Sequence, residues 1–187
     1  IADSVNTTVR RVDPSGIITT YAGVPGRFYE DGGDGDLATN VAIGGVADVA
    51  LDSAGNLYIA DPHNGRIRKV DPGTHVITTV AGGGDPPGGN NEGLPAKSAL
   101  INPSGVFVDA AGNIYIADGN ANKIWKVDAT TQVIRTFAGN GSSGFSGDGG
   151  AATAAALAQP TRAVVDSAGN VIIADTGNIA LRKVTPD

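Results

Sequence analysis

The side chains with the clearest chemical potential in this chain are carboxylates that recur at a regular spacing. The tripeptide Ile-Ala-Asp occurs four times, at intervals of 58, 57 and 57 residues, and it ends at Asp3, Asp61, Asp118 and Asp175. A second acidic set occupies matching places in the glycine-rich segments between the tripeptides, at Asp34, Glu92 and Asp148. Carboxylates in this arrangement can bind hard cations, pair with a basic partner, or cap turns of the main chain.

Segment 30–36 is the best candidate for a cation site. It reads Glu-Asp-Gly-Gly-Asp-Gly-Asp and interleaves oxygen ligands with glycine, as loops that bind hard cations do. We therefore predict Asp31, Asp34 and Asp36 as candidate Ca²⁺ ligands, and we expect no other cofactor. The segment lacks the twelve-residue spacing and the closing Glu of an EF-hand loop. The competing interpretation is that these Asp residues cap turns through hydrogen bonds to the main chain.

A candidate binding rim follows from the direction of the loops, because the loops that carry the repeated acidic residues are expected to leave the sheets on the same side. Its members are Asp61, Asn64, Glu92, Asp118, Asp148 and Asp175. The functional interpretation is a surface for a cation or a basic partner. The structural interpretation is that a residue repeated in every unit holds that unit together. In that case the recurring Arg and Lys residues would form ion pairs with the Asp residues or with a neighbouring turn.

Few residues of this chain could carry out catalysis. It has no Cys and only two His, His63 and His75, which fall in loops expected on opposite rims. A thiol nucleophile and a three-His zinc site are therefore excluded, and no nucleophile motif accompanies His63. Asp48 and Arg162 are charged, do not repeat, and are expected nearest the axis of the fold, so they are the best remaining candidates. We predict no catalytic residues and no enzymatic activity.

The elements that must position these residues form a repeat. Each unit contains four short runs rich in Val, Ile, Thr and aromatic residues, which is typical of β-strands. The first two runs are joined by the tight turn Asp-(Ser/Ala)-Ala-Gly-Asn, which begins at Asp52, Asp109 and Asp166. The pattern predicts a four-stranded antiparallel meander, and its repetition predicts the blades of a β-propeller.

Two segments resemble a known family. Residues 105–118 read Gly-Val-Phe-Val-Asp-Ala-Ala-Gly-Asn-Ile-Tyr-Ile-Ala-Asp, and residues 61–70 read Asp-Pro-His-Asn-Gly-Arg-Ile-Arg-Lys-Val. Both resemble NHL repeats, and the loop 138–150 is similar to that of long-loop bacterial members. The resemblance implies a propeller, usually of six blades, in a family whose members often bind proteins or RNA. Relatives of the same architecture include lyases and metal-dependent lactonases. The His that often precedes Arg in this repeat is missing, since Gly65, Asn122 and Ala180 stand near that place.

The expected fold is all-β, with about 3.3 repeats in a single propeller segment, 1–187. The predicted units are a partial blade at 1–23, blades at 45–82 and 104–139, and a partial blade at 161–187. Together they contribute 14 strands, whereas a closed ring of four-stranded blades needs about 16 or more. The end blades would expose apolar faces, so we expect the chain to associate with copies of itself or with the remainder of a longer chain.

The charge and composition of the chain limit the classes of partner that it can bind. The formal net charge is −6 and aromatic residues make up 5%, which argues against a nucleic-acid partner. No apolar run approaches the ~20 residues needed for membrane insertion. We predict a non-catalytic protein-interaction or structural scaffold, self-associating or part of a longer secreted or surface protein of bacterial type. The alternatives are a propeller enzyme of the lyase or metal-dependent lactonase type, and a Ca²⁺-stabilised adhesion module.

Overall fold

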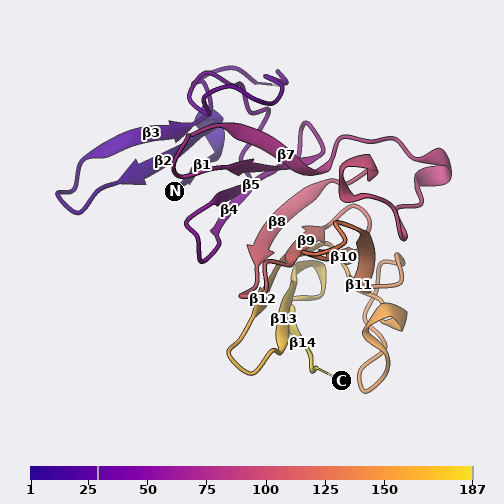
Figure 1. Cartoon of the computed structure of the whole chain (residues 1–187). Coiled ribbons are helices and arrows are strands. Elements are labelled where there is room, and N and C mark those ends of the chain that lie inside the picture. The colour runs from indigo at the N-terminus through magenta and orange to yellow at the C-terminus, as the bar shows by residue number, and fades with distance from the viewer. Residues whose placement is uncertain (29, 187) are drawn as a thin grey trace.

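The computed structural model describes residues 1–28 and 30–186, which form four antiparallel sheets that follow one another along the chain. Figure 1 shows these sheets as an open fan, from the indigo N-terminal sheet to the yellow C-terminal one. The first sheet contains β1 (Ala2–Asp3), β2 (Thr8–Val12) and β3 (Ile18–Ala22). The second contains β4 (Asp48–Leu51), β5 (Leu57–Asp61), β6 (Arg66–Val70) and β7 (Ile77–Gly82). The third contains β8 (Pro103–Val108), β9 (Ile114–Asp118), β10 (Lys123–Val127) and β11 (Ile134–Ala138). The fourth contains β12 (Pro160–Val165), β13 (Val171–Asp175) and β14 (Ala180–Val184).

Each sheet is a meander, because strands that follow each other in the chain also pair with each other. The predicted all-β fold of antiparallel propeller blades is therefore confirmed. The outermost end of the predicted unit 161–187, Asp187, lies outside the described residues.

The tight turns between the first two strands of a unit are fixed by one carboxylate. Asp52 Oδ1 accepts hydrogen bonds from the main-chain N–H groups of Ala54 (3.0 Å) and Asn56 (2.9 Å), and Gly55 has a φ of 83°. The same turn is built around Asp109 and Asp166. Because only glycine adopts this φ without strain, the Gly in the repeat motif determines where the hairpin closes.

The core lies between consecutive sheets rather than within one layer. The central strands β5 and β9 are buried along their whole length, so both faces of these sheets are covered. Ile59 packs in the cluster between the first and second sheets, Ile116 in that between the second and third, and Ile173 in that between the third and fourth. Burial on both faces explains why these strands read as continuous apolar runs.

The innermost strands do not begin at equivalent residues. β4 begins at Asp48, whereas the innermost strands of the third and fourth sheets begin at Pro103 and Pro160. Proline is tolerated as the first residue of a strand, and a bulge follows each of these prolines. The proline lowers the strand signal in the sequence, but the main chain beyond it still pairs with the neighbouring strand.

One main-chain position after each second strand of a unit takes the left-handed conformation. Its φ lies between 52° and 60° at Thr7, Gly65, Asn122 and Ile179. The conformation is thus set by the repeat geometry, whichever residue occupies the position.

Helical structure in the described part of the chain consists of short 3₁₀ turns. They are η1 (Ser4–Asn6), η2 (Pro87–Gly89), η3 (Ala96–Ser98), η4 (Ala152–Ala154) and η5 (Thr176–Asn178). None of these turns has the length or apolar character of a helix that crosses a membrane.

Candidate functional site

The Asp that ends each second strand holds the long loop that precedes its own sheet. Asp61 is fully buried, and its Oδ1 accepts hydrogen bonds from the main-chain N–H groups of Gly45 (3.2 Å) and Asn64 (3.4 Å). Its Oδ2 accepts a third bond from Asn64 Nδ2 (2.9 Å). Asp118 and Asp175 accept the equivalent main-chain bonds from Asn102 (3.1 Å) and Ala158 (2.7 Å). These carboxylates therefore act on the chain itself, as the structural interpretation of the rim requires.

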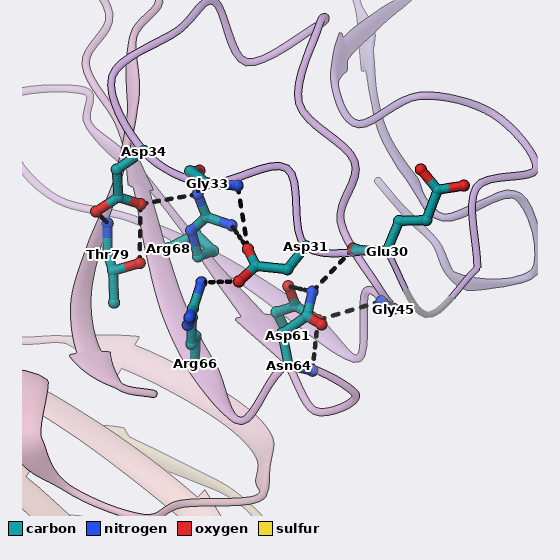
Figure 2. Close-up of polar contacts among 10 residues, drawn as sticks. All are labelled: Glu30, Asp31, Gly33, Asp34, Gly45, Asp61, Asn64, Arg66, Arg68 and Thr79. Carbon is teal, nitrogen blue, oxygen red and sulfur yellow. Dashed lines mark hydrogen bonds and ion pairs between the residues drawn. The ribbon is translucent and has the colours of Figure 1, made fainter. Parts of the chain in front are cut away.

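A cluster of charges surrounds Arg68 in the second sheet, and we call Asp31, Asp34, Asp61, Arg66 and Arg68 the Arg68 cluster (Figure 2). The Arg68 side chain is fully buried, and its Nη2 lies 2.9 Å from Asp34 Oδ1 and also bonds the carbonyl oxygen of Gly33. Asp31 is reached by Arg66 Nη1 at 2.6 Å and by Arg68 Nη1 at 3.9 Å. Two guanidinium groups thus fasten the loop 30–36 onto the second sheet.

Asp34 also binds the outermost strand of the second sheet. Its Oδ2 accepts a hydrogen bond from the main-chain N–H of Thr79 (2.9 Å), and its Oδ1 accepts one from Thr79 Oγ1 (2.9 Å). Burial acts to raise the pKa of Asp34, but the Thr79 hydrogen bonds and the charge of Arg68 outweigh it and lower that pKa. For Asp61 desolvation prevails over its hydrogen bonds and the charge of Arg68, and it raises the pKa.

The predicted Ca²⁺ ligands are therefore directed at protein donors. Asp31 and Asp34 face Arg66 and Arg68, and Asp36 Oδ1 accepts a hydrogen bond from the main-chain N–H of Leu37 (2.6 Å). Within residues 1–28 and 30–186, no three or more His, Cys, Asp or Glu side chains are grouped as a metal site would require. Asp31 and Asp34 already have guanidinium partners, so the geometry at these two carboxylates favours ion pairing.

The third sheet carries an apolar version of the same arrangement. Trp125 takes the place of Arg68, since both stand opposite a Thr of the outermost strand, and its Nε1 donates to Asp118 Oδ2 (3.2 Å). Glu92 takes the place of Asp34, and its Oε2 accepts the main-chain N–H of Thr136 (3.0 Å). The bond from the loop carboxylate to the Thr main chain is retained while the buried arginine is not.

The fourth sheet returns to the charged version. Arg182 Nη2 lies 2.5 Å from Asp148 Oδ1, and Arg182 Nη1 lies 3.4 Å from Asp175 Oδ2. The guanidinium also stands over the ring of Phe145, 4.6 Å from its centroid. A groove of about 770 Å³ adjoins this pair, and it is lined by residues of the third sheet, the loop 147–155 and β14.

At the axis of the fan, Asp48 and Arg162 meet although 114 positions separate them in the sequence. Arg162 Nη1 lies 3.0 Å from Asp48 Oδ1, and Asp48 Oδ2 accepts the main-chain N–H of Val106 (3.1 Å). Asp48 therefore links the innermost strands of three sheets. The Asp48 side chain is 13% exposed and that of Arg162 is 51% exposed, so the pair borders solvent.

The two histidines lie in different kinds of loop. His63 Nδ1 is within 2.7 Å of the Gly44 carbonyl oxygen, in the connection from β5 to β6. His75 lies between β6 and β7, where its ring packs edge-on against Tyr21. They take part in separate contacts and do not form a shared site.

The sequence reasoning missed the main-chain donors of Thr79 and Thr136. A signal for them exists, because an Ile two positions before a Thr recurs at Ile77 and Ile134 with the same spacing as the acidic residues. The pairing itself depends on how each loop folds onto the following sheet.

Comparison with known proteins gives relatives that contain this repeat. The chain is 34% identical to SUPPRESSOR OF QUENCHING 1, a chloroplastic protein of Arabidopsis thaliana, over 134 residues, which are 68% of this chain and 12% of that protein. It is 30% identical to human NHL repeat-containing protein 2 over 140 residues, which are 72% of this chain and 19% of that protein. The chain thus spans less than a fifth of each of these relatives. No protein-family model matches it.

Solved structures share the fold. A protein of unknown function from Bacteroides thetaiotaomicron superposes with a TM-score of 0.70 at 23% identity, over 96% of this chain and 42% of that one. Streptogramin B lyase superposes with a TM-score of 0.59 at 13% identity, over 96% and 45%. A protein described as a putative gluconolactonase gives 0.60 at 11% identity, over 97% and 52%. At these identities the likeness is one of fold, and it spans both enzymes and proteins without an assigned activity.

Proposed function

Since the chain belongs to the NHL-repeat β-propeller family, we propose that it is a non-catalytic interaction scaffold whose open blade faces are covered by further protein, including copies of itself. The observation that carries the proposal is the exposure of Leu181. Its counterparts in the preceding sheets, Val9, Ile67 and Ile124, are 0–3% exposed because the next sheet covers them. Leu181 is 76% exposed. An apolar face of this kind favours association.

The opposite end of the fan supports the same proposal with polar groups. Arg10 stands where Arg68 and Arg182 stand in later sheets, but among the described residues its ion pair is with Asp3, at 3.8 Å, and not with a loop carboxylate like those that the other two bind. The neighbouring Thr8 Oγ1 is buried without a hydrogen-bond partner among these residues. A covering loop that brings a carboxylate to Arg10 would therefore stabilise this face.

The solution mass tests the proposal. We expect light scattering over a range of concentrations to give multiples of 18.6 kDa, because head-to-tail packing of open faces buries Leu181. Leu181→Asp should shift the mass towards the monomer, whereas Leu51→Asp, a matched change of a leucine 65% exposed, should not. A protein that remains monomeric at every concentration would contradict self-association.

A second candidate function rests on the Asp48–Arg162 pair. The pair does not repeat, borders solvent and lies at the axis, and the fold is shared with a lyase and a putative gluconolactonase. An enzyme built on this pair should hydrolyse or cleave a lactone-type substrate in a manner that Asp48→Asn abolishes. A panel of lactones, assayed with and without divalent cations, checks this alternative. The Ca²⁺-stabilised adhesion role and the extracytoplasmic location stay predictions.

A further inference from the structure

The long loop between the third and fourth sheets begins with an asparagine-glycine pair, whose two residues can react with each other. Asn-Gly occurs twice in the chain, at Asn64-Gly65 and at Asn140-Gly141. Glycine has no side chain to shield its main-chain nitrogen, so this nitrogen can attack the side-chain amide carbon of the preceding asparagine. The two pairs have the same sequence, and their surroundings therefore decide which of them reacts.

The attacking nitrogen is engaged at one pair and free at the other. The N–H of Gly65 donates a hydrogen bond to the Pro62 carbonyl oxygen (3.2 Å), and Gly65 is half-buried. The N–H of Gly141 has no hydrogen-bond partner among residues 1–28 and 30–186, and Gly141 is exposed. A base in the solvent can therefore take the proton from Gly141 without breaking a bond of the fold.

The side-chain amide of Asn140 is presented in a way that favours attack. Asn140 is exposed, and its Oδ1 accepts a hydrogen bond from the main-chain N–H of Ser142 (2.8 Å). This donor stabilises the negative charge that develops on the oxygen when a nucleophile adds to the carbon. Asn140 Nδ2 donates to the Ala154 carbonyl oxygen (3.1 Å), a bond at the surface of the loop.

The side-chain amide of Asn64 is fixed by the second sheet. Its Nδ2 donates to Asp61 Oδ2 (2.9 Å) and to the Glu30 carbonyl oxygen (3.2 Å). Asp61 is fully buried, so turning the amide of Asn64 towards Gly65 would remove a donor from a buried carboxylate. Both the nucleophile and the amide are therefore restrained at this pair.

A positive charge lies beside the free nitrogen. Lys123 Cε would lie 3.5 Å from a Cβ placed on Gly141, so the end of this side chain stands next to the loop. Its ammonium group also lies over the ring of Trp125, 4.7 Å from the centroid, which holds it at the rim of the third sheet. A nearby cation favours the negatively charged form of a titrating group, so Lys123 assists loss of the proton from the Gly141 nitrogen.

We propose that Asn140-Gly141 is a site of spontaneous deamidation, at which the loop modifies itself with water as the co-reactant. The Gly141 nitrogen loses its proton to a base in the solvent and bonds to Asn140 Cγ. The bond from Cγ to Nδ2 breaks, and Nδ2 leaves as ammonia after taking up a proton. Water then opens the cyclic imide at either of its carbonyl groups and leaves aspartate or isoaspartate. The site does not depend on the scaffold function.

The product does not fit the contacts that Asn140 makes. A carboxylate has no donor for the Ala154 carbonyl oxygen, and isoaspartate adds a methylene group to the main chain. This addition falls directly after the two bonds that join the start of the loop to its second half, from Gly139 to Ala152 (3.0 Å) and from Asn140 to Ala155 (2.8 Å). The reaction therefore loosens the start of the loop and adds a negative charge to an acidic chain.

Peptide mapping by mass spectrometry tests the proposal on the full chain, incubated in mildly alkaline buffer with and without guanidinium chloride. Conversion of an amide to an acid changes the mass, and fragment ions assign the residue. We expect Asn140 to react at similar rates in the folded and unfolded chain. Asn64 should react about tenfold or more slowly in the folded chain than in the unfolded one, because its hydrogen bonds must break first.

The variant Lys123→Gln tests the role of the cation. It should slow the reaction at Asn140 about two- to fivefold in the folded chain, as expected for an exposed charge, and leave the rate at Asn64 unchanged. An unchanged rate at Asn140 in this variant would overturn the role of Lys123.

The site itself is overturned if folding suppresses the reaction at Asn140 as strongly as at Asn64, since the loop would then protect both pairs. Equal rates at the two residues in the folded chain would overturn it as well, because the sequence alone would then decide. The reaction is followed in the chain whatever its solution mass, so failure of this site and failure of the scaffold function are measured separately.

Discussion

The second and third sheets place different chemistry on the same backbone. In the second sheet the buried position opposite the outermost strand is Arg68, enclosed by the carboxylates of Asp31 and Asp34. In the third sheet it is Trp125, which is 4% exposed and packs in the cluster between the second and third sheets. Lys123 lies over the indole ring, 4.7 Å from its centroid, at the rim of the sheet.

What the two sheets share identifies the contact that the repeat depends on. In both, a loop carboxylate accepts the main-chain N–H of a threonine in the outermost strand, and a buried Asp holds the end of the same loop. The residue between these two anchors can be a guanidinium or an indole, because each offers an N–H donor and fills the space. The loop-to-strand bond is the constant feature, and the buried charge is the variable one.

The largest expected effect on stability is that of replacing Trp125, the buried residue of the third sheet. Trp125→Ala should lower the free energy of unfolding by about 3–5 kcal/mol, because it leaves a cavity between two sheets. Trp125→Phe keeps most of the packing and removes one donor to Asp118, and it should cost about 1 kcal/mol. Urea unfolding followed by circular dichroism measures both. Equal losses for the two variants would mean that the hydrogen bond, and not the packing, distinguishes this sheet.

Stability should be nearly as sensitive to replacement of Arg68, the buried residue of the second sheet, but for a different reason. Arg68→Met should cost about 3 kcal/mol, since it removes the positive charge near the buried Asp61 carboxylate and breaks the ion pairs with Asp31 and Asp34. Asp31 and Asp34, each about 40% exposed, regain partial solvation, which limits the loss. Adding Asp31→Asn and Asp34→Asn to the same variant should recover part of the loss. If Arg68→Met is neutral, the buried guanidinium is dispensable and the contrast between the sheets is one of packing alone.

The smallest effect is on the pH dependence of stability. The pKa of Asp34 is lowered in the folded protein, so its contribution is present above about pH 4 and is lost as the pH falls through the folded pKa. Asp34→Asn should therefore flatten the decline in unfolding free energy on acidification. Asp61 has a raised pKa, so its contribution is present at low pH and is lost as the pH rises through that pKa. Asp61→Asn should change the profile in the opposite sense, and the same sense for both variants would contradict these assignments.

The sheets could be predicted from the sequence because each strand and turn occurs several times, so that one unit supports the interpretation of the next. The matching of Asp34 and Glu92 could be predicted for the same reason. Their partners could not be, because Thr79 and Thr136 belong to the following sheet, 44 or 45 positions further on. These contacts depend on how a glycine-rich loop crosses between sheets, and no local pattern records that path.

Asp48 and Arg162, at the axis of the fan, could be identified for the opposite reason. Asp48 and Arg162 were identified from the sequence because they break the repeat, and the structure brings their side chains to 3.0 Å. A residue that departs from the repeat indicates a position at which one sheet differs from the others. The exchange of Arg68 for Trp125 is a departure of the same kind, but its effect can be understood only from the structure, where these residues lie beside Asp61 and Asp118.

The left-handed position that follows each second strand has a consequence for protein engineering. Gly65 and Asn122 suit this conformation, whereas Ile179 is a β-branched residue at a φ of 53° with a side chain that is 97% exposed. At Gly65 the loop that covers the sheet passes close to this position, because a Cβ there would lie 2.9 Å from the Ile101 carbonyl oxygen. Ile179 therefore combines a strained main chain with a place that a covering protein would approach, and replacing it by Gly or Asn should relieve the strain and open the face for stacking a further blade.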